Sequence, residues 1–231
     1  MNMRTENKEK KEYVLFILDE SGSMSSCKKA TIDGFNEQIQ ELKKTKDIKT
    51  FVSLVKFNSS VNTLFWNKPL EEVEELTNNT FEPNGMTSML DAIGISINKL
   101  QNDTPNRTID DISFLVFIIS DGAENNSREF TWDSIGKIMK TCEEDKAWTI
   151  TYMGANQDLS IVQTALYIPT GNIMMYNNTS TGTGSAFTTM SNGTANYRSA
   201  RSTMTVAELQ VSGVVNTFYS SVGGSSTEIT S

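Results

Sequence analysis

The stretch YVLFILDESGSMS, residues Tyr13 to Ser25, decides the fold of this chain. It begins with an uninterrupted apolar run, which is the pattern of a strand buried on both faces of a parallel sheet. Asp19, Ser21 and Ser23 follow at alternate positions, and Gly22 lets the chain turn tightly between the two serines. The sequence therefore predicts a loop with one carboxylate and two hydroxyls at the carboxyl end of a buried strand.

A second segment repeats this plan later in the chain. Residues 114–119, FLVFII, form another continuous apolar run, and a Ser-Asp-Gly sequence containing Asp121 follows it. Ligands of open α/β sheets bind beyond the carboxyl ends of the strands, near the point where the strand order reverses. We therefore expect Asp121 to lie beside the loop that carries Asp19, Ser21 and Ser23.

The chemistry of these side chains favours a hard cation. Carboxylate and hydroxyl oxygens suit Mg²⁺, whereas Zn²⁺ is usually bound by nitrogen and sulfur. Glu20 would add a carboxylate, but alternation along the chain should point it away from Asp19. We therefore leave Glu20 out of the predicted site.

The rest of the chain alternates between strands and helices. A doubly wound, mostly parallel α/β sheet with helices on both faces is the expected fold, and a hairpin at residues 58–60 gives it one antiparallel edge strand. Hydroxyl residues mark helix starts: Thr87 or Ser88, then Thr131, and a capping box that begins at Thr205. Residues 101–111 read as a polar loop. The expected strands are 13–18, 51–57, 61–66, 114–119, 148–153 and 173–176, and the expected helices are 27–44, 89–100, 132–142 and 159–166.

Composition changes divide the chain into one main domain and flanking segments. The composition after residue 177 shifts to Ser, Thr, Gly and Asn, with one loose helix expected around Phe187. The predicted segments are a polar N-terminal arm (1–12), the α/β domain (13–176), a Ser/Thr-rich, helical C-terminal extension (177–222) and a disordered tail (223–231).

Composition also excludes several classes of chemistry. The sequence contains no histidine, so Ser-His-Asp and Cys-His catalysis and His-ligated zinc are ruled out within the chain. A formal net charge of −8 argues against nucleic acid as a partner. Cys27 and Cys142 are far apart and form no CxxC motif, so we expect free thiols. No apolar run is long enough for a membrane span or signal peptide, which predicts a cytoplasmic protein.

Three segments together resemble the von Willebrand factor A domain. They are DESGS at residues 19–23, GMT at 85–87 and SDG at 120–122, and the resemblance covers residues 13 to about 176. Further stretches, LDESGSMSS, TIDGFNEQI, GMTSMLDAIG, SDGAENNSREFT and YMGANQD, are similar to stand-alone bacterial and phage members of this family.

The resemblance implies a metal-ion-dependent adhesion site. In that site Ser21 and Ser23 bind the metal directly, Thr87 binds it in the ligand-engaged state, and Asp19 and Asp121 lie near it, one or both acting through water. The implied ion is Mg²⁺, with Mn²⁺ as the alternative, and an Asp or Glu of a partner protein completes its coordination. The plainer interpretation is that these residues only cap helices and close turns.

Three functions are compatible with the sequence. The first is a non-enzymatic, metal-dependent protein-binding module, whose metal affinity without a partner should be micromolar or weaker. The second is a magnesium-dependent phosphotransferase or hydrolase, although Ser21 stands where a second carboxylate is expected and no GxxxxGK[ST] loop exists. The third is a phage structural or assembly protein with an incidental metal site. Glu124, Asn125 and Asn126 follow Asp121 and either contact a partner or simply form a polar loop.

Overall fold

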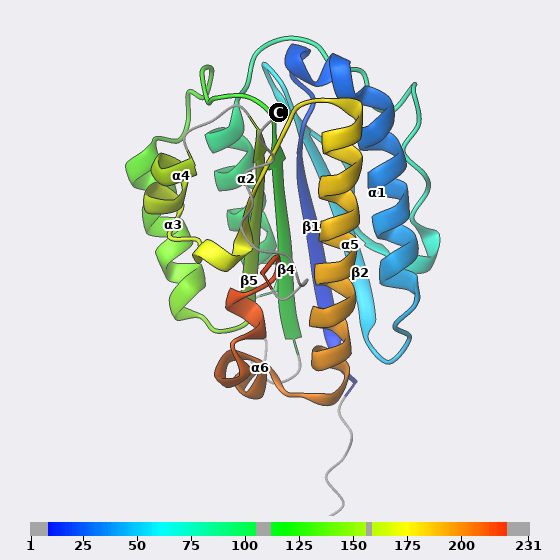
Figure 1. Ribbon diagram of the computed structural model, residues 1–231. Coiled ribbons are helices and arrows are strands. Elements are labelled where there is room, and N and C mark those ends of the chain that lie inside the picture. Colours follow the sequence, from blue (N-terminus) through cyan, green and yellow to red (C-terminus); the bar gives the residue numbers. More distant parts are fainter. Residues whose placement is uncertain (1–8, 105–111, 156–158, 221–231) are drawn as a thin grey trace, which may run out of the picture.

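The computed structural model describes residues 9–104, 112–155 and 159–220, and it has the expected α/β architecture (Figure 1). Every predicted strand and helix is present in it. The strands are β1 (Lys11–Asp19), β2 (Lys49–Phe57), β3 (Val61–Pro69), β4 (Ile112–Ser120), β5 (Trp148–Ala155) and β6 (Ile173–Tyr176). The helices are α1 (Lys28–Lys43), α2 (Met89–Asp103), α3 (Trp132–Glu144), α4 (Leu159–Leu166), α5 (Ser180–Thr203) and α6 (Val206–Ser212).

The strands form one mixed sheet in the order β3-β2-β1-β4-β5-β6. All neighbours are parallel except β2 and β3, which form the predicted antiparallel hairpin at one edge. The strand order reverses between β1 and β4, which are the two apolar strands of the sequence. The predicted fold class is therefore confirmed. The switch point lies between β1, which ends in Asp19, and β4, which Asp121 follows directly.

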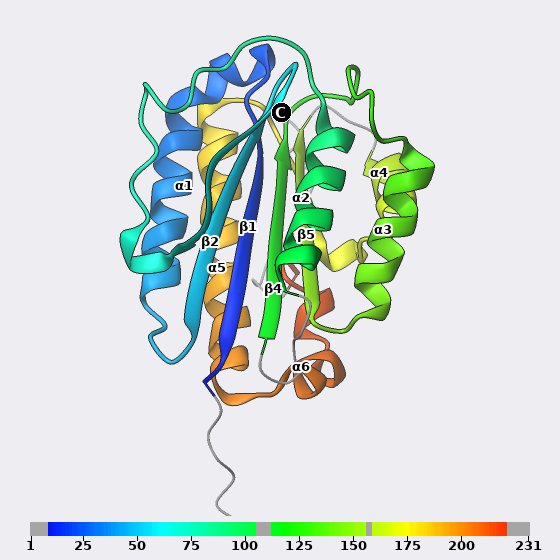
Figure 2. The ribbon, with the colours of Figure 1, turned by 180° about the vertical axis from the view of Figure 1, so that it is seen from behind.

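Helices cover both faces of the sheet, and the two faces use alternate side chains of β1. Phe16 and Leu18 belong to the core beneath α1 and α5, which lie in front of the sheet in Figure 1. Leu15 and Ile17 belong to the core beneath α2 and α3, which face the viewer in Figure 2. This double burial explains why β1 is apolar at consecutive positions.

Several boundaries differ from the sequence prediction, and at two of them polar side chains have partners. Helix α2 continues to Asp103, so the predicted loop at 101–103 is wrong. The Asp103 carboxylate accepts hydrogen bonds from Lys99, one turn earlier, and from the Trp66 indole. Residues 105–111 lie outside the described part of the chain. Strand β1 begins at Lys11 because Glu12, fully buried, forms an ion pair with Arg198 of α5.

Helix α5 is tightly packed rather than loose. It runs along α1, and Phe187, Met190 and Tyr197 are buried in the same core as Phe16. Gly34 of α1 makes this approach possible, because a Cβ atom there would lie 2.2 Å from Cγ of Phe187. The domain boundary predicted at residue 176 remains a prediction, but side chains from before and after this residue belong to one hydrophobic core.

Several smaller predictions are also confirmed. No disulfide joins Cys27 and Cys142, and both thiols are buried. Thr131 caps α3, and Thr205 and Glu208 form a capping box at the start of α6. Within the described residues, no helix has the length and apolar character needed to cross a membrane.

Candidate functional site

Asp19 is the buried centre of the candidate site. It is the last residue of β1, and both carboxylate oxygens are engaged: Oδ1 accepts the Ser21 backbone N–H at 2.7 Å, and Oδ2 accepts the Ser120 hydroxyl at 2.6 Å. Burial raises the pKa of Asp19 to about 6 from an ordinary value of 3.8, against the opposing effect of these hydrogen bonds. The negative charge of nearby Asp121 raises it further.

Ser21 and Ser23 connect Asp19 to Asp121. The chain leaves β1 and enters a short 3₁₀ turn, Gly22–Cys27, which brings the two serine hydroxyls to 3.1 Å from each other. Ser23 Oγ donates to Asp121 Oδ1 at 2.6 Å. Asp121 follows β4 directly and is buried, and this burial raises the pKa of its carboxyl. The two segments predicted to meet at the strand ends therefore do meet.

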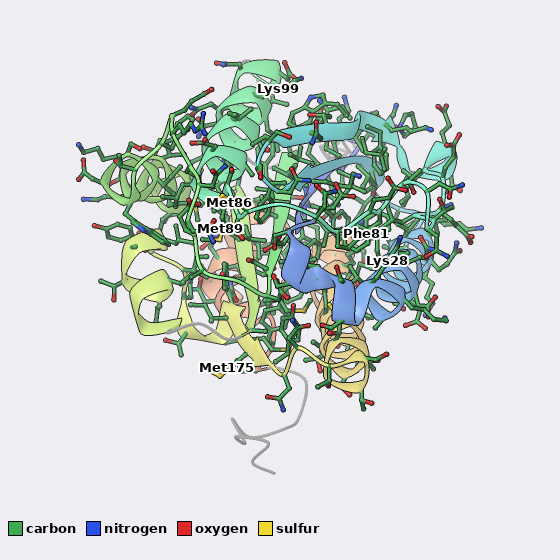
Figure 3. The ribbon with its side chains drawn as sticks, turned by 90° about the horizontal axis from the view of Figure 1, so that it is seen from above. Lys28, Phe81, Met86, Met89, Lys99 and Met175 are labelled. Carbon is green, nitrogen blue, oxygen red and sulfur yellow. The ribbon has the colours of Figure 1, made fainter. Side chains whose placement is uncertain are left out.

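Thr87 reaches the same place from a third loop. The Gly22 N–H donates to the Gly85 carbonyl at 3.1 Å, and Gly85 has φ +75°, a conformation that favours glycine. A Cβ atom on Gly122 would lie 3.5 Å from both Ser23 Oγ and Thr87 Oγ1. The Thr87 hydroxyl therefore faces the same small region as Ser23. Figure 3 looks down on this end of the sheet, where Met86 and Met89 mark the loop of Thr87.

Glu20 lies outside this group, as alternation along the chain predicts. Its carboxylate forms an ion pair with Lys56 of β2 at 2.6 Å and accepts the Glu82 backbone N–H at 2.7 Å. Lys56 also donates to the Thr80 carbonyl. The half-buried Lys56 is therefore paired with Glu20.

The loop after β4 holds Thr87 and the start of α2. Asn125 Oδ1 accepts the Thr87 N–H at 3.0 Å, and Glu124 Oε2 accepts the Leu90 N–H at 2.9 Å. Ser88 occupies the predicted N-cap position, but its side chain makes no capping hydrogen bond because Glu124 takes that role. The polar residues after Asp121 therefore have an internal function in supporting the site.

Two supporting residues were not predicted from the sequence. Ser120 holds Asp19 through its hydroxyl, and its position next to Asp121 is the only sequence signal for it. Asn178, between β6 and α5, donates from its side-chain amide to Asp121 Oδ2. No motif marks Asn178, because only the fold brings it to this end of the sheet.

The donor set fits a hard divalent cation. Burial raises the pKa of both carboxyls, Asp121 raises that of Asp19 further, and three hydroxyls lie beside them, so positive charge would be stabilised here. Oxygen ligands of this kind match Mg²⁺ or Mn²⁺. Among the described residues there is no cluster of three or more His, Cys, Asp or Glu side chains that could bind a metal. A site here would therefore depend on hydroxyls for half or more of its protein ligands.

The fold and this arrangement define the class of protein. The model of the von Willebrand factor type A domain matches residues 14–158, and the chain belongs to this family. Domains of this family generally mediate protein–protein interactions. Comparison with curated proteins gives no match.

Solved structures of several proteins share the fold. Proximal thread matrix protein 1 from the mussel byssus is 11% identical, with a TM-score of 0.57 over 78% of this chain and 47% of that chain. The PilB minor pilin of Streptococcus sanguinis is 11% identical, with a TM-score of 0.57 over 80% of this chain and 61% of that one. A von Willebrand factor type A protein from Catenulispora acidiphila is 12% identical, with a TM-score of 0.53 over 81% of this chain and 43% of that one. The chain spans less than two thirds of each of these proteins, and the likeness concerns the fold.

Proposed function

We propose that this protein is a non-enzymatic binding domain that recognises an acidic residue of a partner protein through a bound Mg²⁺ ion, with Mn²⁺ as the alternative. The metal-site residues are Asp19, Ser21, Ser23, Thr87 and Asp121. The observation that carries the proposal is their convergence from three loops at the carboxyl ends of β1 and β4. That place is the switch point where open α/β sheets bind ligands.

Each side chain has a distinct role in this proposal. Ser21 and Ser23 would bind the ion through their hydroxyl oxygens, and Thr87 would join them when a partner is engaged. Asp19 and Asp121 would balance the charge of the ion, one or both through water. The bound ion would offer an open coordination position to an outside carboxylate, since Mg²⁺ keeps several exchangeable waters.

The charge of the site supports an acidic partner. Two carboxylates balance the 2+ charge of the ion, so a third carboxylate from outside can approach without strong repulsion. A site with three or four carboxylates of its own would repel it. The chain as a whole is acidic, with a formal charge of −8, which disfavours nucleic acid. The ion is therefore the feature that would attract an Asp or Glu side chain.

The contacts of Asp19 support a binding role over phosphoryl transfer. A phospho-acceptor carboxylate needs an oxygen open to the incoming phosphorus. Asp19 is fully buried, and its two oxygens already accept hydrogen bonds from Ser21 and Ser120. The sequence also contains no histidine for a general base step.

A pull-down from lysate of the native host tests this function. Immobilised protein is compared in Mg²⁺ and in EDTA, with a Ser21→Ala, Ser23→Ala double variant beside the wild type. Ser25→Ala is the matched control, because Ser25 is in the same loop but is exposed, and its hydroxyl donates to the Gly22 carbonyl. We expect partner proteins to be retained by wild type and Ser25→Ala in Mg²⁺ only. Equal retention by the double variant, or in EDTA, would show that recognition does not use the metal.

A further inference from the structure

Asn178 belongs to the candidate site although it comes from a distant part of the chain. It lies between β6 and α5, and its side chain contacts both the loop after β1 and the residue after β4. The amide nitrogen donates to Asp121 Oδ2 and, at 3.4 Å, to the Ser23 carbonyl. The amide oxygen accepts the Ser26 hydroxyl at 3.2 Å. One side chain thus links three segments of the site.

These contacts fix the orientation of the Asp121 carboxylate. Asp121 Oδ1 accepts the Ser23 hydroxyl at 2.6 Å, and Asp121 Oδ2 accepts the Asn178 amide, so the carboxylate is held from two sides. The amide is neutral, which means that it orients the carboxylate without cancelling the charge. A lysine or arginine at this place would compete with a cation for Asp121.

Asn178 is itself held by a rigid element. The next residue, Thr179, is the N-cap of α5, and its hydroxyl accepts the Gly182 N–H at 3.0 Å. Helix α5 is packed into the core through Phe187 and Met190. Supporting groups on packed elements position ligands more accurately than groups on free loops.

We propose that Asn178 is a positioning residue for the metal site: it orients Asp121 and fixes the backbone of the Ser23–Ser26 segment for cation binding. The inference rests on the proposed function, because it concerns the same site. Groups that hold metal ligands in this way commonly change metal affinity by 10-fold to 100-fold when they are removed.

Mn²⁺ titration followed by electron paramagnetic resonance tests the inference. We expect Asn178→Ala to weaken Mn²⁺ binding about 10-fold and to broaden the spectrum of bound Mn²⁺, because Asp121 loses its fixed orientation. Asn177→Ala is the matched control, since Asn177 is the exposed neighbour, and it should bind like wild type. Asn178→Leu, which keeps the number of side-chain heavy atoms and loses all three hydrogen bonds, should reproduce the Asn178→Ala result. Thermal unfolding in EDTA shows which of the two Asn178 variants is folded, and Mn²⁺ binding is judged on a folded variant.

The outcomes separate the two claims. If wild type binds Mn²⁺ and a folded Asn178 variant binds it within about twofold, with an unchanged spectrum, the positioning role is wrong while the proposed function stands. If wild type binds no Mn²⁺, the proposed function fails and the inference fails with it.

Discussion

At the scale of single residues, the site is built from groups whose burial is unfavourable without a cation. Asp19 and Asp121 are both buried, and the pKa of each is raised mainly by desolvation. Such an arrangement destabilises the metal-free protein and is expected where function, rather than stability, has determined the residues. Stability of the metal-free protein should therefore respond to the charge of Asp19.

Asp19→Asn should stabilise the metal-free protein at high pH. The folded-state pKa of Asp19, about 6, is above the ordinary value of 3.8, so folding becomes less favourable as pH rises through this window. The shift corresponds to a cost of about 3 kcal/mol above pH 7. We expect urea unfolding in metal-free buffer at pH 8 to show Asn more stable than Asp by roughly 1–3 kcal/mol, and the difference to vanish near pH 4.

Metal should narrow this difference. Mg²⁺ at millimolar concentration should stabilise wild type and leave Asp19→Asn unchanged, since a ligand stabilises only the state that binds it. An Asn variant that is less stable than wild type at pH 8 without metal would contradict the account of Asp19.

The sequence reveals the site residues to the extent that they are local. Asp19, Ser21 and Ser23 share one loop, and Asp121 repeats the same position after the second buried strand. Asn178 has no local signal, because it follows a four-residue edge strand and its role depends on where α5 begins. Supporting contacts of this kind depend on tertiary structure and not on spacing.

At the scale of elements, α5 is the feature that the sequence describes least well. Many of its buried positions are polar or small, including Thr183, Thr194, Arg198 and Arg201, so the apolar periodicity of a packed helix is weak. Arg198 is buried because Glu12 of β1 pairs with it. The residues around Glu12 and around Arg198 do not indicate this ion pair, because the two residues are 186 positions apart in the sequence.

Gly34→Ala should disrupt the packing of α1 against α5. The added Cβ would meet the Phe187 ring at 2.2 Å, and overpacking of this kind costs about 1–3 kcal/mol or more. The gain in helix propensity, about 1 kcal/mol, offsets only part of this cost. We expect a lower free energy of unfolding in a urea titration.

Gly184→Ala is the matched control for this substitution. Gly184 lies within α5, and a Cβ atom there would have no neighbour within 4 Å. The same Gly-to-Ala change should therefore be neutral or stabilising by up to about 1 kcal/mol. If both variants were equally stable, close contact between α1 and α5 would not be a feature of the folded protein.

At the scale of the whole molecule, the fold follows from two buried strands and the helices between them. Continuous apolar runs in β1 and β4 require helices on both faces, and the parallel order places their carboxyl ends together. This topology was predictable because the two central strands show continuous apolar runs and the helices between strands show the helical apolar period. The packing of residues 180–220 onto the same core was not, since it depends on contacts between the two ends of the chain.

The central claim is that Asp19, Ser21, Ser23, Thr87 and Asp121 bind a divalent cation, and calorimetric titration tests it most directly. Mg²⁺ and Mn²⁺ are titrated into wild type and into the Ser21→Ala, Ser23→Ala variant, with Ca²⁺ for comparison. We expect a single site on wild type with micromolar or weaker affinity, because three of the five side chains are neutral. The double variant should show no binding. Absence of binding by wild type, or equal binding by both proteins, would contradict the account.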